Sequence, residues 1–226
     1  MRDRASDDRE LRENPVELRE LLLRAAADDL AAVGQLFDMH RNRLRRMIRV
    51  RIDHRLQGRL DPSDVLQEAF LAFARALPTY TKRPEVPFYL WLRCIAGRKL
   101  ATLHRRHLGT HKRDPGREVS IHRGGVPEAS SVSLADQLIG KFTTPSRALR
   151  RAEERARIQH ALSEMDELDR EVLALRHFEQ LSNKETALVL EMTEAAASVR
   201  YMRALRRLKT QLMSLPGGTS EAPDGA

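Results

Sequence analysis

The sequence predicts an all-α protein of two small helical domains joined by a flexible linker, the C-terminal domain being a helix-turn-helix. Apolar residues in stretches rich in Ala, Leu, Arg and Glu recur three and four positions apart, which is the helical period. Strand signals are nearly absent, and aromatic residues make up only 4% of the chain. A stretch rich in Gly, Pro, Ser and Thr separates the two helical parts, as expected of a linker.

The first domain is expected to span residues 16–108, after a charged and disordered tail at 1–15. Helical spacing starts at Val16 and continues to about Ile52, and it predicts two helices that meet near Asp28 and Asp29. The domain therefore begins with a helical pair.

A third helix is predicted from Pro62 to Leu77. Asp61 is a favourable N-cap, and Pro62 suits the first helical position. A loop is expected next, followed by a long helix from about Phe88 to His107. The loop is marked by Pro78, Pro84 and Pro87.

The linker is predicted at residues 109–145, with one short helix at Leu134–Ile139. Helical patterning resumes at residue 146 and defines a second domain, 146–215. The last residues, 216–226, have the composition of a disordered tail.

The overall charge favours anionic partners. Lys and Arg number 40 against 32 Asp and Glu, a formal net charge of +8. The N-terminus lacks an apolar signal segment, and no run approaches the ~18 apolar residues of a membrane helix. The single cysteine, Cys94, rules out an internal disulfide and fits a reducing compartment. We therefore expect a cytoplasmic protein with no membrane association.

The strongest local pattern lies in residues 181–212. Ser182 and Glu185 form a capping box at the start of a short helix, and Thr193 caps a second helix after a turn of about three residues. This spacing is typical of a helix-turn-helix. The turn often carries Gly where the backbone is left-handed, but Glu191 stands there, which predicts ~1 kcal/mol of strain or a different turn.

One side of the second helix is rich in arginine, which suits phosphate groups and the guanine edge in the major groove. The alternative is a solvated basic face on an ordinary bundle helix. The predicted DNA-binding residues are Ala196, Val199, Arg200, Arg203, Arg206 and Arg207.

A polar stripe also marks the helix that starts at Pro62. At about 100° per residue, Asp61, Asp64 and Glu68 share one side, with Gln67 at its edge. Capping and the helix dipole account for Asp61 and Asp64 but not for Gln67 and Glu68. A divalent metal site is an alternative, but the Glu-x-x-His motif usual in helical bundles is missing.

The helix from Phe88 carries a Trp beside basic groups, an arrangement that grips single-stranded nucleic acid by stacking and charge. Core packing of the Trp is the alternative. The predicted residues are Trp91, Arg98, Lys99, Thr102, Arg105 and Arg106. No cofactor, metal or catalytic residue is predicted, since the histidines are irregularly spaced and lack Cys partners.

Together these stretches resemble the extracytoplasmic-function class of bacterial RNA polymerase sigma factors, over residues from about 16 to 213. DPSDVLQEAFLAFARAL is similar to the family's polymerase-docking helix, and FYLWLRCIAGRKLATLHRRH resembles the helix that melts and reads the −10 promoter element. MDELDREVLALRHFEQLSNKETALVLEMTEAAASVRYMRALRRL resembles the −35 reading domain. The family commonly has Asn and Asp where this chain has Arg98 and Thr102.

The resemblance implies a sigma factor that binds core polymerase, recognises the −10 and −35 elements, starts transcription and performs no chemistry itself. It implies docking on the β′ clamp through Asp61, Asp64, Gln67 and Glu68, with the β flap, double- and single-stranded promoter DNA and an anti-sigma factor as further partners. The alternative is a stand-alone helix-turn-helix transcription regulator.

Overall fold

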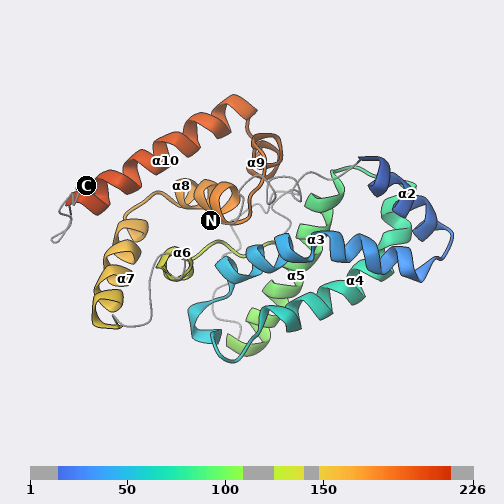
Figure 1. Ribbon diagram of the computed structural model, residues 1–226, viewed down its shortest axis with the longest axis horizontal. Helices are drawn as coiled ribbons and strands as arrows, with labels where there is room; N and C mark the ends of the chain where they lie inside the picture. Colours follow the sequence, from blue (N-terminus) through green and yellow to red (C-terminus); the bar gives the residue numbers. More distant parts are fainter. Residues whose placement is uncertain (1–14, 109–124, 140–147, 215–226) are drawn as a thin grey trace, which may run out of the picture. The chain divides into compact units, whose positions relative to one another are not determined.

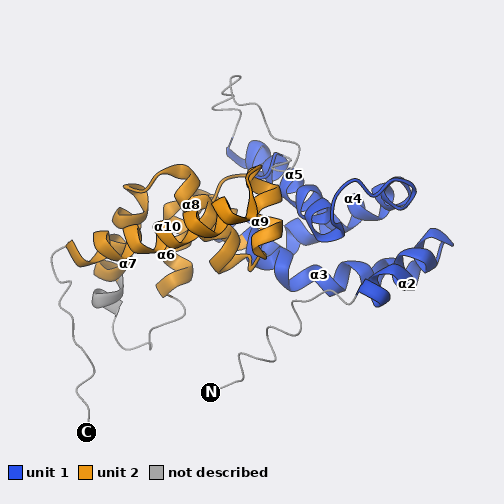
Figure 2. Cartoon of the chain, turned by 90° about the horizontal axis from the view of Figure 1, so that it is seen from above, with its two compact units in different colours: residues 1–48, 58–126 blue, residues 49–57, 127–226 orange. Residues whose placement is uncertain are grey.

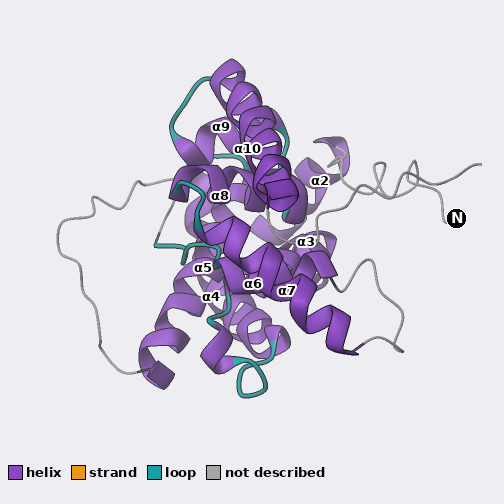
Figure 3. Ribbon diagram, turned by 90° about the vertical axis from the view of Figure 1, so that its left-hand side faces the viewer, coloured by secondary structure: helices purple, strands orange, loops and turns teal. Residues whose placement is uncertain are grey.

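The structure, a computed structural model, describes residues 15–108, 125–139 and 148–214. Helices and their connecting loops make up these ranges without a β-strand (Figure 1, Figure 3), which confirms the all-α prediction there. The chain divides into two compact units (Figure 2): unit 1, residues 1–48 and 58–126, and unit 2, residues 49–57 and 127–226. Most of both predicted tails and most of the predicted linker lie outside the described residues.

Unit 1 is built from α2 (Pro15–Ala26), most of α3 (Leu30–Arg51), α4 (Pro62–Lys82) and α5 (Phe88–Leu108). The first two helices separate at Asp28, whose φ of 62° breaks the helix. The Asp29 carboxylate then accepts the backbone N–H groups of Ala31 and Ala32, which caps α3. The predicted break near Asp28 and Asp29 is therefore confirmed.

An aromatic cluster organises the core of unit 1. Its closest pair is Tyr80 and Trp91, stacked with ring centroids 4.4 Å apart. Phe73 lies edge-on to Trp91 at 5.9 Å. The largest fully buried side chains of this unit include Leu36, Phe37, Leu44, Met47, Ile48, Leu66, Phe73, Phe88, Tyr89, Leu92 and Arg93.

The predicted end of α4 at Leu77 is wrong, because the helix continues through Pro78 to Lys82. Proline removes one backbone donor from a helix but does not stop it where packing holds the following turn. Tyr80 provides that packing: its ring is buried, and its hydroxyl donates to the Val86 carbonyl at 2.9 Å.

At Gly97, the segment that contains Val126 lies close against α5 within unit 1. A Cβ placed on Gly97 would lie 2.4 Å from Cγ2 of Val126 and 3.0 Å from its Cα. Only glycine leaves room for this segment, which follows an undescribed stretch of the chain and returns to α5.

Unit 2 contains the remaining helices. They are η1 (His54–Leu56), α6 (Ser131–Ile139), α7 (Ala148–Ser163), α8 (Glu167–Leu173), the π-helical turn η2 (Ala174–Phe178), α9 (Asn183–Leu190) and α10 (Glu194–Ser214). Helix α10 packs on α8 and α9, and α6 packs on α7. Helix α6 begins three residues before the short helix predicted at Leu134. The buried Ser133 hydroxyl donates to the Ile52 carbonyl at 2.9 Å and fixes α6 to segment 49–57.

A buried ion cluster, which the sequence did not predict, joins segment 49–57 of unit 2 to α8 and to the residue after η2. The Arg51 guanidinium lies between two carboxylates: its Nη2 is 2.6 Å from Glu171, and its Nε donates to Glu179 at 2.9 Å. It also donates to the Pro127 carbonyl at 2.7 Å. Burial alone would lower the pKa of Arg51, but the two carboxylates outweigh it and hold this pKa above its ordinary value.

Candidate nucleic-acid and partner interfaces

The predicted helix-turn-helix is formed by α9 and α10. The Ser182 hydroxyl accepts the Glu185 N–H at 3.1 Å, and the Glu185 carboxylate accepts the Ser182 N–H at 2.7 Å, which confirms the capping box. The Thr193 hydroxyl accepts the Ala196 N–H at 3.1 Å and caps α10. The turn passes through Glu191, which has left-handed φ and ψ of 54° and 47°, so the predicted strain is present.

Replacement of Glu191 by glycine is therefore expected to stabilise unit 2. Glycine has no Cβ penalty at positive φ, and Glu191→Gly should raise the free energy of unfolding by about 1 kcal/mol in urea denaturation. Lys209→Gly, at an exposed position inside α10, is the matched control and should instead lose about 1 kcal/mol. A loss of stability in both variants would contradict the strain at Glu191.

The six residues predicted on α10 are called the recognition face here. They differ in exposure and in ion pairing. Ala196, Val199, Arg203 and Arg206 are exposed, and Val199 is 49% exposed. Arg203 and Arg206 form no ion pair with any residue of the described chain. The full set is Ala196, Val199, Arg200, Arg203, Arg206 and Arg207.

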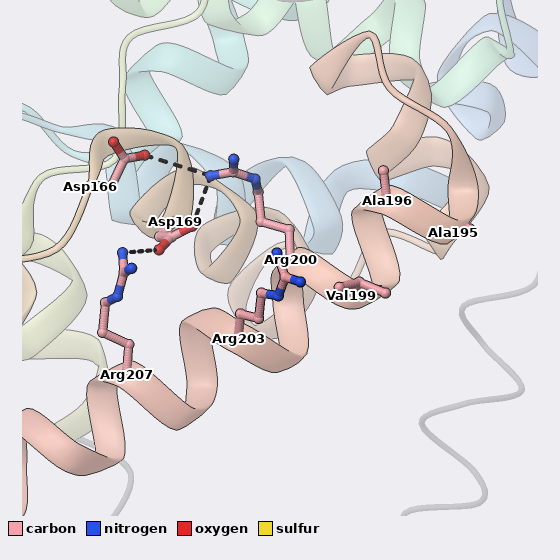
Figure 4. Close-up of a pocket in the computed structure, with 8 residues that line it drawn as sticks. All are labelled: Asp166, Asp169, Ala195, Ala196, Val199, Arg200, Arg203 and Arg207. Carbon is pink, nitrogen blue, oxygen red and sulfur yellow. Dashed lines mark hydrogen bonds and ion pairs between the residues drawn. The ribbon is translucent and has the colours of Figure 1, made fainter.

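The other two arginines of the recognition face are held by Asp169 of α8 (Figure 4). Arg200 Nη1 donates to Asp169 Oδ1 at 2.9 Å, and Arg207 Nη1 donates to Oδ2 at 2.7 Å. Asp166 lies 3.6 Å from Arg200. Sequence reasoning missed Asp169, because an acidic residue in the first turn of a helix already has a sufficient local explanation in the helix dipole.

Four of the six residues predicted on α5 lie at its surface. Arg98, Thr102, Arg105 and Arg106 are exposed, and Arg105 donates to the Thr102 hydroxyl at 3.1 Å. The Thr102 hydroxyl in turn donates to the Arg98 carbonyl at 2.9 Å, so these residues form one connected surface. We call Trp91, Arg98, Lys99, Thr102, Arg105 and Arg106 the α5 face.

Trp91 serves the core and still reaches the surface. Its ring stacks on Tyr80, as the packing alternative predicted, but the residue remains partly exposed. By helical spacing it shares a stripe with Arg98 and Arg105. Trp91 therefore forms the half-buried end of the α5 face.

The α4 ridge, defined as Asp61, Asp64, Gln67 and Glu68, is exposed along its whole length. Asp61 accepts the Ser63 N–H at 2.7 Å, and Asp64 accepts the Asp61 N–H at 3.2 Å, so these two residues cap the helix. Glu68 lies 3.7 Å from Lys99 of α5, which places the ridge beside the α5 face. Leu71, the next residue along this side, is 51% exposed.

The remaining features are the single cysteine, possible metal sites and possible membrane helices. Burial raises the pKa of the Cys94 thiol above its ordinary value, although Arg93 and Arg98 oppose this shift, so the reactive thiolate is disfavoured. In the described ranges, no three His, Cys, Asp or Glu side chains are arranged to hold a metal ion. Within the same ranges, no helix has the length and apolar character needed to cross a bilayer.

In comparisons with known proteins, two family models match separate parts of the chain. Sigma-70 region 2 matches residues 36–109, and Sigma-70 region 4 matches residues 155–208. The α4 ridge and the α5 face lie in the first match, and the recognition face lies in the second. The two matches therefore define a transcription initiation factor of the sigma-70 type.

Individual proteins similar to this chain show to which group of sigma-70 factors it belongs. The ECF RNA polymerase sigma factor SigD of Mycobacterium tuberculosis is 30% identical over 190 residues, which are 84% of this chain and 81% of SigD. The ECF RNA polymerase sigma factor ShbA of Streptomyces griseus is 33% identical over 146 residues, 65% of this chain and 69% of ShbA. The chain belongs to the extracytoplasmic-function (ECF) sigma factors of the sigma-70 family.

A solved structure, that of CnrH in complex with the cytosolic domain of CnrY, is similar with a TM-score of 0.51 and 26% identity. It covers 87% of this chain and 97% of CnrH. The chain is thus an RNA polymerase sigma factor that acts in transcription initiation through a DNA-binding helix-turn-helix, and it is not an enzyme. A stand-alone regulator would leave the region 2 match unexplained.

Proposed function

We propose that three surfaces of this sigma factor divide its work: the α4 ridge binds core polymerase, the α5 face holds the −10 element, and the recognition face binds the −35 element. The observation that carries the proposal is that each surface is exposed and chemically distinct on its own helix. Residues 16–108 and 146–215 are the proposed functional domains, joined by the linker. The protein acts where the polymerase is, in the cytoplasm.

The α4 ridge suits a basic protein surface rather than DNA, because its carboxylates would repel phosphates. Exposed Leu71 beside it adds the apolar contact that interface centres commonly contain. The occupant we propose is the β′ clamp of the polymerase, and the β flap is the proposed partner of the second domain. The CnrH complex with CnrY supports an anti-sigma factor as a further partner.

The α5 face suits a separated DNA strand. Its exposed guanidinium groups neutralise phosphates, and the accessible part of Trp91 offers an aromatic surface to an unpaired base. The recognition face suits duplex DNA, because an α-helix fits the major groove and arginine recognises guanine there. The linker raises the effective concentration of the second contact once the first has formed.

Run-off transcription with purified core polymerase tests this division. Arg98→Ala/Arg105→Ala should reduce transcripts from a fully paired promoter about tenfold or more, whereas a template already unpaired at −10 should restore part of the activity, because the duplex no longer has to be opened there. Arg203→Ala/Arg206→Ala should reduce transcripts on both templates, since the −35 contact is lost on both.

Lys209→Ala is the control, because Lys209 is exposed on α10 outside the recognition face. It should leave transcription within twofold of wild type, and all these variants should still bind core polymerase. Absence of promoter-specific transcripts with the wild-type chain and active core, or equal behaviour of both double variants on both templates, would overturn the proposed division.

A further inference from the structure

Asp169 is a buried carboxylate that contacts two arginines of the recognition face. Its side chain is 8% exposed, whereas its partners Arg200 and Arg207 are 36% and 56% exposed. Each carboxylate oxygen accepts from a different arginine. The two arginines are seven residues apart, two helical turns, so a single carboxylate fixes both on the same side of α10.

The ion pairs leave part of each guanidinium available. An arginine has five N–H donors, and each of these two arginines uses Nη1 for Asp169. The pocket that contains them is also lined by Ala196, Val199 and Arg203 of the recognition face (Figure 4). Arg200 and Arg207 therefore have a fixed orientation, whereas Arg203 on the same face has no ion-pair partner in the described chain.

The Asp169 carboxylate should affect DNA binding through charge and through side-chain order. The buried carboxylate offsets one of the two positive charges, which reduces attraction to phosphates of any sequence. It also fixes the arginines before binding, so less side-chain freedom is lost when DNA acceptors match their positions. Both effects favour a matching sequence over an arbitrary one.

We propose that Asp169 is a positioning residue that sets the specificity of the −35 contact by holding Arg200 and Arg207. The inference rests on the proposed role of the recognition face. Asp169 itself does not touch DNA. It acts through the two arginines, and its loss changes the preference between sequences rather than the capacity to bind.

Competition binding of the holoenzyme, full-length chain plus core polymerase, tests this with a promoter duplex and a duplex of equal length whose −35 element is scrambled. For Asp169→Asn we expect tighter binding to the scrambled duplex by about two- to fivefold, and a promoter-to-scrambled affinity ratio about tenfold lower. The salt dependence of scrambled-duplex binding should become steeper, since the carboxylate that offset one positive charge of the face is gone.

Asp166→Asn is the matched control. Asp166 lies on the same turn, but it is 60% exposed and contacts Arg200 only at 3.6 Å. Asparagine still caps α8 in its place. This variant should keep the affinity ratio within twofold of wild type, and a loss as large as that of Asp169→Asn would overturn the specific role of Asp169.

A double-mutant cycle separates positioning from folding. In an Arg200→Ala/Arg207→Ala background, Asp169→Asn should cause no further fall in the ratio, and a further fall would overturn the proposal. If Asp169→Asn unfolds unit 2, Arg200→Lys/Arg207→Lys replaces it, since lysine keeps the charge but not the fixed fork. That variant should also lower the ratio, and an unchanged ratio would overturn the proposal.

The same assay distinguishes a failure of the proposed −35 contact from a failure of the role of Asp169. If the wild-type holoenzyme shows no preference for the intact −35 element, the proposed function fails. If the wild type shows the preference and folded Asp169→Asn retains it in full, only the role of Asp169 fails.

Discussion

Arg51→Ala is expected to lower the free energy of unfolding of unit 2 by about 3–5 kcal/mol, because the substitution leaves buried carboxylates without their cation. Glu179 is fully buried, and the Glu171 side chain is only 12% exposed. Neither carboxylate can recover full hydration when the guanidinium is removed. A truncation of this kind costs more than the intact pair contributes, since an unpaired buried charge is the unfavourable state.

The loss of stability in Arg51→Ala should be confined to unit 2. Hydrogen exchange followed by mass spectrometry should show faster exchange in α8, η2 and segment 49–57. Trp91 lies in unit 1, so its fluorescence transition in urea reports on the other unit and should change much less.

Arg155→Ala is the control for removal of an arginine from an ion pair in unit 2. Arg155 contacts Asp136 at 2.5 Å, but both side chains are more accessible, at 45% and 27%. Its loss should cost less than about 1 kcal/mol. If Arg51→Ala proves no more harmful than Arg155→Ala, the buried cluster does not hold unit 2 together.

The local features of the fold could be predicted from the sequence. Helical periodicity separated exposed from buried positions on α4, and all four ridge residues are exposed as the stripe required. The capping boxes depend on residues only three apart, so Ser182 and Glu185 could be paired by spacing alone. The strained turn at Glu191 followed from the same local rules.

The pairings between distant residues could not be predicted. Asp169 lies 31 and 38 residues from its arginines, and Arg51 lies 128 residues from Glu179. Periodicity gives the face on which a charge lies but not the residue that it meets after folding. The same limit explains Pro78, because the packing of Tyr80 that continues α4 depends on another helix.

A charge reversal on α4 is expected to cause a large loss of affinity for core polymerase. Glu68→Lys should weaken binding to core polymerase about 10- to 100-fold, since like charge would then face the proposed basic surface of the clamp. Glu68 suits this test better than Asp61 or Asp64, whose carboxylates cap α4. Its own contact, with Lys99 at 3.7 Å, is a surface pair whose loss has little effect on folding.

Glu20→Lys provides the same change of charge at an exposed position of α2 in the same unit, and it should bind core polymerase within about twofold of wild type. Biolayer interferometry against immobilised core at several salt concentrations measures both variants. The difference between them should shrink as salt rises, because ions screen exposed charges. Arg203→Ala/Arg206→Ala should retain wild-type affinity for core, which separates polymerase docking from DNA binding. Equal affinities of Glu68→Lys and Glu20→Lys at low salt would remove the α4 ridge from the polymerase interface.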